Sequence, residues 1–212
     1  MKKFIAIISS VMMLAACADF LGIEPEGTTP STGLDYAKAE NIFKPVSAAY
    51  ASMRTYGTHD VPYFSMFEIT SDNADKGSTP EDAAPQKEMD EFSYTSTSSI
   101  VNNYWVDYYN VVSSANNAIY QMSLFRSNPN LSMNAENLKT VDECEAEAKF
   151  IRAYIYFYLL NIYGDQALLG NDQGDGVVLS LKPYNGYNPN DVAGRSTNAD
   201  VWSLIIQDLK DA

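Results

Sequence analysis

The stretch Glu145–Asp165 reads EAEAKFIRAYIYFYLLNIYGD and decides the fold. Apolar and small residues recur in it at steps of three and four, in one stripe: Ala146, Phe150, Ala153, Phe157, Leu160 and Gly164. This spacing predicts a long amphipathic helix, because residues three or four apart lie on one helix face. The small residues in the stripe allow a neighbouring helix to approach closely.

A second periodic stretch precedes the first. Its apolar residues follow the same steps: Val101, Trp105, Tyr108, Val112, Ala115, Ile119 and Met122. The predicted helix ends near Arg126, before Asn128-Pro129-Asn130. A loop of roughly 15–20 residues is expected between the two long helices. Trp105 lies on the apolar stripe, so we interpret it as a core residue rather than a platform for a sugar.

A shorter helix is predicted on each side of this pair. The first covers residues 36–54, and Pro45 is expected to kink it or to mark a short preceding segment. The last begins near Ser196-Thr197, with Asp200 in its first turn, and has these apolar residues inside: Val201, Leu204, Ile205 and Leu209. No Gly, Asn or Pro ends this helix, so residues 35–212 are expected to be an incomplete part of a longer helical domain.

Irregular segments connect the predicted helices. Residues 56–100 are rich in turn-forming residues and are expected to hold a short strand or helical turns at most. Loops of such length inside compact folds are commonly functional. In the segment after Gly164, Asn171–Gly176 resembles the first half of a calcium loop, but its twelfth position is Lys182, so a solvated turn is favoured. The predicted class is therefore all-α with long irregular loops.

The beginning of the chain has the pattern of an export signal. Two lysines precede an apolar run that ends in Leu14-Ala15-Ala16-Cys17, which resembles the lipobox of bacterial lipoproteins. Residues 1–16 are thus expected to be a signal peptide, and 17–34 a leader anchored through acyl chains on Cys17. Acylation leaves Cys144 without an intrachain disulfide partner, and we interpret it as a small buried residue rather than a nucleophile.

Composition excludes several classes of function. Lys and Arg number 14 against 27 Asp and Glu, for a net charge of −13, and such a surface repels nucleic acid. The single histidine, His59, cannot form a His-pair metal site, and a Ser–His triad would have to use it alone. The sequence indicates no metal or other cofactor.

The helix Glu145–Asp165 resembles the signature helix of the SusD/RagB family of outer-membrane lipoproteins of Bacteroidetes. Three further pieces agree in the same order: Cys17-Ala18-Asp19-Phe20-Leu21; Trp105-x-x-Tyr108 with Asn116 and Ile119; and Arg195-Ser196 followed by Asp208-Leu209-x-x-Ala212. The resemblance implies tetratricopeptide-like helix pairs. It also implies a binding protein, not an enzyme, that captures oligosaccharides or other nutrients at the cell exterior. The implied partner is a TonB-dependent, SusC-like barrel transporter in the outer membrane.

Candidate ligand residues come from the loop 56–100. Binding of a sugar uses flat aromatic faces, together with amides and carboxylates that bond its hydroxyls. We expect these residues to contribute: Tyr63, Asp72, Asn73 and Tyr94. The alternative for Ser71-Asp72-Asn73 is a helix cap or turn.

Two other functions share the same residues. A glycoside hydrolase needs two facing carboxylates, and the following supply that chemical type: Glu143, Glu145, Glu147, Asp72 and Asp75. A helical-repeat protein that binds only proteins would have the same helices. Within the signature helix, Arg152 is expected to pair with Glu145 or Glu147, which is a structural role.

Overall fold

The computed structural model describes residues 33–59, 64–77, 84–184, 186, 188–189 and 192–212. The chain divides into two compact units, Met1–Asp35 and Tyr36–Ala212, and the second is described here. Its elements are η1 (Ala39–Asn41), α3 (Phe43–Met53), η2 (Phe64–Ile69), α5 (Ala84–Asp90), α6 (Ser99–Ser127), α7 (Ala135–Tyr163), η3 (Ala167–Leu169) and α8 (Asn198–Asp211). Every regular element in the described ranges is helical, which confirms the all-α prediction.

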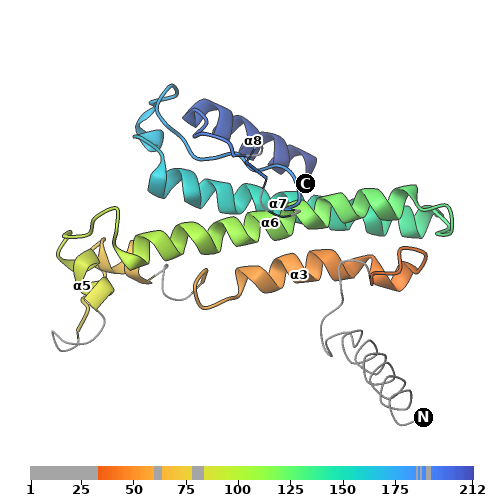
Figure 1. The fold of residues 1–212 in the computed structure, drawn as a ribbon, viewed down its shortest axis with the longest axis horizontal. Helices are drawn as coiled ribbons and strands as arrows, with labels where there is room; N and C mark the ends of the chain where they lie inside the picture. Colours follow the sequence, from red (N-terminus) through yellow and green to blue (C-terminus); the bar gives the residue numbers. More distant parts are fainter. Residues whose placement is uncertain (1–32, 60–63, 78–83, 185, 187, 190–191) are drawn as a thin grey trace, which may run out of the picture. The chain divides into compact units, whose positions relative to one another are not determined.

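The centre of this unit is the helix pair α6 and α7, which run side by side (Figure 1). Each is 29 residues long, and the connection between them covers only residues 128–134. The predicted loop of 15–20 residues was wrong because α7 begins at Ala135, well before Ala146, the first residue of its predicted apolar stripe. Asn134 caps that polar start by accepting a hydrogen bond from the Asn137 amide, at 2.8 Å.

The buried face of α6 agrees in large part with the predicted stripe. Tyr108, Val112, Ala115 and Met122 are buried, whereas Val101, Trp105 and Ile119 are half-buried. Trp105 packs between two aromatic rings, with centroids 4.7 Å from Tyr109 and 4.9 Å from Tyr163. This packing agrees with its interpretation as a core residue.

The buried face of α7 agrees only in part with the prediction. Ala153 and Leu160 of the predicted stripe are buried, but Phe150 and Phe157 are 45% and 42% exposed. The core side also includes Cys144, Ala148, Ile151, Ile155 and Leu159. Both faces of this helix are apolar, so periodicity alone did not identify the one that α6 covers. Cys144 is fully buried, and burial raises the pKa of its thiol to about 11, as suits an inert core residue.

Helix α3 packs on both α6 and α7 and buries Val46 and Ala49. The helix predicted over 36–54 is η1 followed by α3, so the alternative of a short preceding segment is confirmed. Pro45 is the third residue of α3 and does not interrupt it. The first four amides of a helix have no intrahelical acceptor, so a proline there removes no hydrogen bond.

Helix α8 packs along α7 and begins where the sequence predicts (Figure 1). Thr197 and Asp200 form a capping box, in which the Asp200 amide donates to Thr197 Oγ1 at 3.1 Å. Val201 and Ile205 are buried as expected, but Leu209 is half-exposed. Asp208 takes the buried position on this face instead.

The reason for that exchange is a buried polar cluster that joins three helices. Arg152 on α7 donates from Nε and Nη2 to the two carboxylate oxygens of Asp208, at 2.7 and 2.8 Å. Its Nη1 donates to Asn116 Oδ1 on α6, at 2.9 Å. The expected pairing of Arg152 with Glu145 or Glu147 was therefore wrong. The true partner lies 56 residues away along the chain, beyond the reach of helix-spacing rules.

The irregular segment after α7 is held against the helices by side chains. Tyr109 and Asn116 donate to the carbonyls of Val178 and Ser180, at 2.7 and 2.8 Å. Arg195 donates to the carbonyl of Gly176, at 2.7 Å. These hydrogen bonds hold residues 176, 178 and 180 in place, although none of the three lies in a helix.

Candidate functional site

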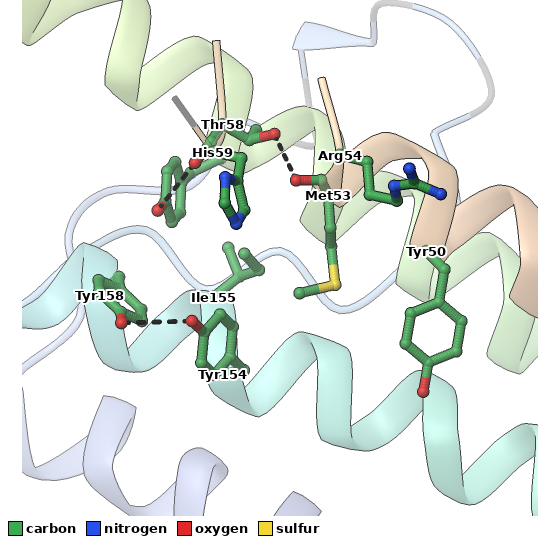
Figure 2. Close-up of a pocket in the computed structure, with 9 residues that line it drawn as sticks. Tyr50, Met53, Arg54, Thr58, His59, Tyr154, Ile155 and Tyr158 are labelled. Atoms are coloured by element: carbon green, nitrogen blue, oxygen red, sulfur yellow. Dashed lines mark hydrogen bonds between the residues drawn. The ribbon is translucent and has the colours of Figure 1, made fainter. Parts of the chain in front are cut away.

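A pocket of about 330 Å³ lies between the end of α3, the turn that follows it, and the middle of α6 and α7 (Figure 2). Its aromatic lining is Tyr50, Tyr108, Tyr154 and Tyr158. The rest of the lining is Met53, Arg54, Thr58, His59 and Ile155. This size falls at the lower end of the range for small-molecule sites, which is about 300–1,000 Å³.

The turn after α3 forms one wall of the pocket. The Thr58 hydroxyl is buried and donates back to the Met53 carbonyl, at 2.8 Å. Tyr108 on α6 donates to the Thr58 carbonyl, at 3.3 Å. At Gly57 an added Cβ would lie 1.9 Å from Asp107 Oδ2, so a larger residue there would require the Asp107 side chain to move. The wall is thus fixed to the helices before any ligand arrives.

The tyrosines of the site are linked in pairs one helix turn apart. The Tyr104 hydroxyl donates to the Tyr108 hydroxyl at 2.7 Å, and the two rings are stacked with centroids 4.2 Å apart. On α7 the Tyr154 hydroxyl donates to the Tyr158 hydroxyl, at 3.2 Å (Figure 2). Burial raises the pKa of Tyr104 and of Tyr108, so both phenols are neutral at pH 7. The pocket therefore offers ring faces together with hydroxyls that donate and accept.

Charged groups are unevenly distributed around the pocket. Arg54 and His59 belong to its lining and are exposed, and no carboxylate is among the residues that line it. Glu147 lies near the Tyr50 hydroxyl, whose pKa is raised by burial first and then by the charge and hydrogen bond of that carboxylate. Among the described residues that line the pocket, Arg54 is thus the only one with a permanent charge, and Glu147 lies just outside the lining at Tyr50.

The ligand residues predicted from the sequence lie elsewhere. Asp72 and Asn73 are exposed in the turn that follows η2, where the Asn73 amide donates to the Glu68 carbonyl at 3.1 Å. Asp72 has a φ of 58°, in the left-handed region. This is the turn that the structural alternative predicted. Tyr94 is exposed after α5, and none of these three residues lines the pocket.

Two predicted site residues, Cys17 and Tyr63, lie outside the described residues, as do the signal peptide 1–16 and most of the leader 17–34. The sequence analysis did not single out the pocket tyrosines as site residues, because each lies on a predicted helix, where packing accounts for an aromatic side chain. The available signal was the tyrosine repeat at four-residue spacing, Tyr104/Tyr108 and Tyr154/Tyr158, together with the excess of Tyr (15) over Phe (9).

Of the carboxylates suggested for a hydrolase, Glu143 pairs with Lys139 at 3.6 Å. Glu145 pairs with Arg126 at 2.8 Å and with Lys149 at 3.3 Å. In the calcium-like segment, the Asn171 side chain donates to the Asp165 carboxylate at 3.1 Å. The backbone carbonyl of Asn171 accepts from the Asn198 side chain at 2.7 Å. Within the described ranges, no three His, Cys, Asp or Glu residues are grouped so that they might hold a metal ion. None of the helices described is both long and apolar enough to cross a membrane.

Known proteins resemble this chain in sequence and in fold. A SusD-like family described as starch-binding and associating with the outer membrane matches residues 19–212. The SusD-like protein P2 of Formosa agariphila is 27% identical over 166 residues, covering 78% of this chain and 30% of that protein.

Solved structures show the same fold. A SusD superfamily protein from Bacteroides thetaiotaomicron has a TM-score of 0.64 at 15% identity, over 82% of this chain and 36% of that one. A protein from Bacteroides vulgatus described as sugar binding has a TM-score of 0.62 at 18% identity, over 81% and 36%.

The chain thus spans about a third of the length of the relatives it matches. The match of the family extends from residue 19 to the last residue, through all of the helices described. The likeness to the solved relatives covers 81–82% of this chain. The chain belongs to the SusD-like family, which is described as starch-binding in association with the outer membrane.

Proposed function

We propose that this chain binds an oligosaccharide in the tyrosine pocket and delivers it to a TonB-dependent, SusC-like barrel transporter in the outer membrane. The observation that carries the proposal is a fixed pocket lined by four tyrosines in a chain of a starch-binding family. The solved relative described as sugar binding supports the same class of ligand. The chain acts in binding, without covalent chemistry on the sugar.

The pocket chemistry suits a pyranose. The apolar C–H face of a sugar ring packs on an aromatic face, while its hydroxyls exchange hydrogen bonds with phenols. Tyr154 and Tyr158 offer both functions at neighbouring positions on α7. Since Thr58 and Tyr108 already fix the opposite wall, binding orders few additional groups, and this limits its entropic cost. A volume of about 330 Å³ accepts a short terminal portion of a glycan rather than a long chain.

Calorimetry and affinity gels test the proposal. The full chain is titrated with starch-derived and other oligosaccharides, beside the variant Tyr154→Ala/Tyr158→Ala and the control Tyr120→Ala. Tyr120 is also an exposed tyrosine but lies outside the pocket lining. Loss of about 1–3 kcal/mol per stacked ring is expected for the double variant only. Equal affinity in all three proteins would remove the pocket from the proposal.

The same samples separate the two other functions. A glycoside hydrolase would release new reducing ends from the glycan, whereas a binding protein leaves it intact. A protein that binds only proteins would retain the barrel in a pull-down and would not be retarded by glycan gels.

Four loop residues remain part of the proposal as a second contact region: Tyr63, Asp72, Asn73 and Tyr94. Asp72 and Asn73 are exposed, so their removal is expected to leave folding intact. Unchanged affinity in Asp72→Ala/Asn73→Ala would exclude these two as ligand residues.

The location proposed is the outer face of the outer membrane, with acyl chains on Cys17 as the anchor. Each buried methylene contributes about 0.8 kcal/mol, so several chains together hold a protein durably. Cys17→Ser is expected to prevent incorporation of labelled fatty acid and to release the protein from membranes. Normal membrane retention of that variant would contradict the anchor.

A further inference from the structure

The arginines of this chain differ in what their guanidinium groups contact. The sequence contains four: Arg54, Arg126, Arg152 and Arg195. Arg126 and Arg152 are bound to carboxylates, and Arg195 to backbone carbonyls. Within the described part of the chain, the guanidinium of Arg54 forms neither an ion pair nor a hydrogen bond. The one unengaged guanidinium is thus also the one that lines the pocket.

The position of Arg54 contrasts with the charge of the chain. The chain has 27 acidic against 14 basic residues, so an arginine has many possible carboxylate partners. Arg126 and Arg152 each bind such a carboxylate. At the pocket, Arg54 and His59 come from the same turn, and no carboxylate belongs to the lining. Figure 2 shows the His59 ring directed toward Ile155 and α7, and Arg54 on the side of Tyr50.

We infer that the pocket selects a saccharide that carries a negatively charged group, a carboxylate or a sulfate, and that Arg54 binds this group. The inference rests on the proposed function and names the ligand class of the same site. A guanidinium presents a planar fork of N–H donors that matches a carboxylate or sulfate in two parallel hydrogen bonds. The tyrosine faces then take the sugar ring, and the charged substituent points to the rim where Arg54 lies.

The chain's overall charge gives the inference a second measurable consequence. A net charge of −13 repels an anionic ligand at long range, and salt screens this repulsion over roughly 8–10 Å at ordinary ionic strength. The contact with Arg54 is local and attractive, so added salt weakens it as well. The variant that lacks Arg54 keeps only the repulsion, and its residual affinity is therefore expected to rise with salt.

Calorimetric titration with three matched ligands tests the inference. The probes are a galacturonan oligosaccharide, a sulfated galactan oligosaccharide and a neutral galactan oligosaccharide of equal length. The proteins are the full chain, Arg54→Gln, and Lys139→Gln, which changes the net charge equally. Lys139 lies on α7 with a largely exposed side chain and is not part of the pocket lining.

We expect at least one anionic ligand to bind more tightly than the neutral one. Arg54→Gln is expected to weaken that ligand about tenfold, the effect of one charge-assisted hydrogen bond. The same variant should leave the neutral ligand unchanged, and Lys139→Gln should affect neither. Arg54→Lys keeps the positive charge but lacks the planar pair of N–H donors, so its loss of affinity for the anionic ligand is expected to be smaller than that of Arg54→Gln. The better of the two anionic ligands identifies the substituent as carboxylate or sulfate.

Two results overturn the inference in different ways. If the neutral ligand binds as tightly as both anionic ones, or if Arg54→Gln behaves as Lys139→Gln does, the anionic class is wrong while saccharide binding stands. If none of the three ligands, nor the starch-derived oligosaccharides, binds the full chain, the proposed function fails together with the inference.

Discussion

The body formed by α6, α7 and α8 and the side formed by α3 and its following turn use polar residues in opposite ways. In the body, Arg152 is only 8% exposed. Its guanidinium forms two hydrogen bonds to Asp208 and one to Asn116. At the α3 side, Arg54 is exposed and four tyrosines line a pocket. Polar groups that are fully engaged hold helices together, and only those left accessible are available to a ligand.

The same comparison explains the family signature. Asn116, Arg152 and Asp208 come from three separate stretches of the sequence, and the structure joins them in one buried cluster. Their shared role is structural, because Arg152 Nε, Nη1 and Nη2 all donate to Asp208 or Asn116 within the cluster. These three residues therefore identify the fold, and they provide none of the free donors that the proposed ligand would need.

The largest expected effect comes from breaking the buried cluster. Arg152→Ala leaves the Asp208 carboxylate buried without its cation, and we expect the free energy of unfolding to fall by about 3–5 kcal/mol. Denaturant unfolding followed by circular dichroism measures the change. The control is Arg126→Ala, whose ion pairs with Asp142 and Glu145 are exposed and contribute about 1 kcal/mol or less. Similar losses in the two variants would contradict the contrast between buried and exposed arginines.

A smaller effect is expected where the segment after α7 passes the start of α8. At Gly176 an added Cβ would lie 2.8 Å from the Thr197 carbonyl oxygen and 2.9 Å from that of Ser196. Gly176→Ala is expected to lower the free energy of unfolding by about 1–3 kcal/mol, because backbone must move. Gly194→Ala is the matched control, since nothing lies within 4 Å of its Cβ. If thermal unfolding of the two variants is indistinguishable, the close approach at Gly176 is not required.

Alkaline pH sharpens the comparison through the buried tyrosines of the body. Burial raises the pKa of Tyr156 from 10.0 to about 12, and it also raises the pKa of Tyr109 and Tyr163. Above about pH 10 the unfolded chain loses these protons first, so the free energy of unfolding falls as pH rises toward 12. Below pH 10 this contribution is fully present. Phenolate absorbance should therefore rise in two steps, with the second step coinciding with unfolding.

Tyr156→Phe is the control for that titration. The Tyr156 hydroxyl accepts a hydrogen bond from the Ser180 amide at 2.7 Å. The variant loses this bond and is therefore expected to be less stable at neutral pH. The fall in stability between about pH 10 and pH 12 should nevertheless be shallower. A single smooth titration of all tyrosines near pH 10 without unfolding would show that these phenols are accessible.

The smallest effect is expected on the exposed side of the molecule. Lys87 and Glu91 form an ion pair one turn apart on and just after α5, with both side chains well exposed. Lys87→Ala is expected to change the free energy of unfolding by about 0.5 kcal/mol or less. A loss above about 1 kcal/mol in denaturant unfolding would mean that surface pairs stabilise this side as the buried pair does the body.

The pattern of the sequence determined the helices themselves and the start of α8. Apolar residues at steps of three and four recur wherever a long helix exists, and Thr197 with Asp200 marks a helix start by local chemistry. The sequence also indicated the family, because Asn116, Arg152 and Asp208 lie in the stretches that resemble it. These features depend on neighbours a few residues apart, which is why periodicity and capping rules reach them.

Only the tertiary structure decided which face of α7 is buried, which residue pairs with Arg152 and where a pocket opens. Phe150 and Ile151 are equally apolar, and the position of α6 selects the second for the core. Asp208 stands 56 residues from Arg152, at a distance where sequence spacing carries no geometric information. The pocket needs α3, α6 and α7 together, because its four tyrosines come from these three helices and line one cavity only where the helices meet.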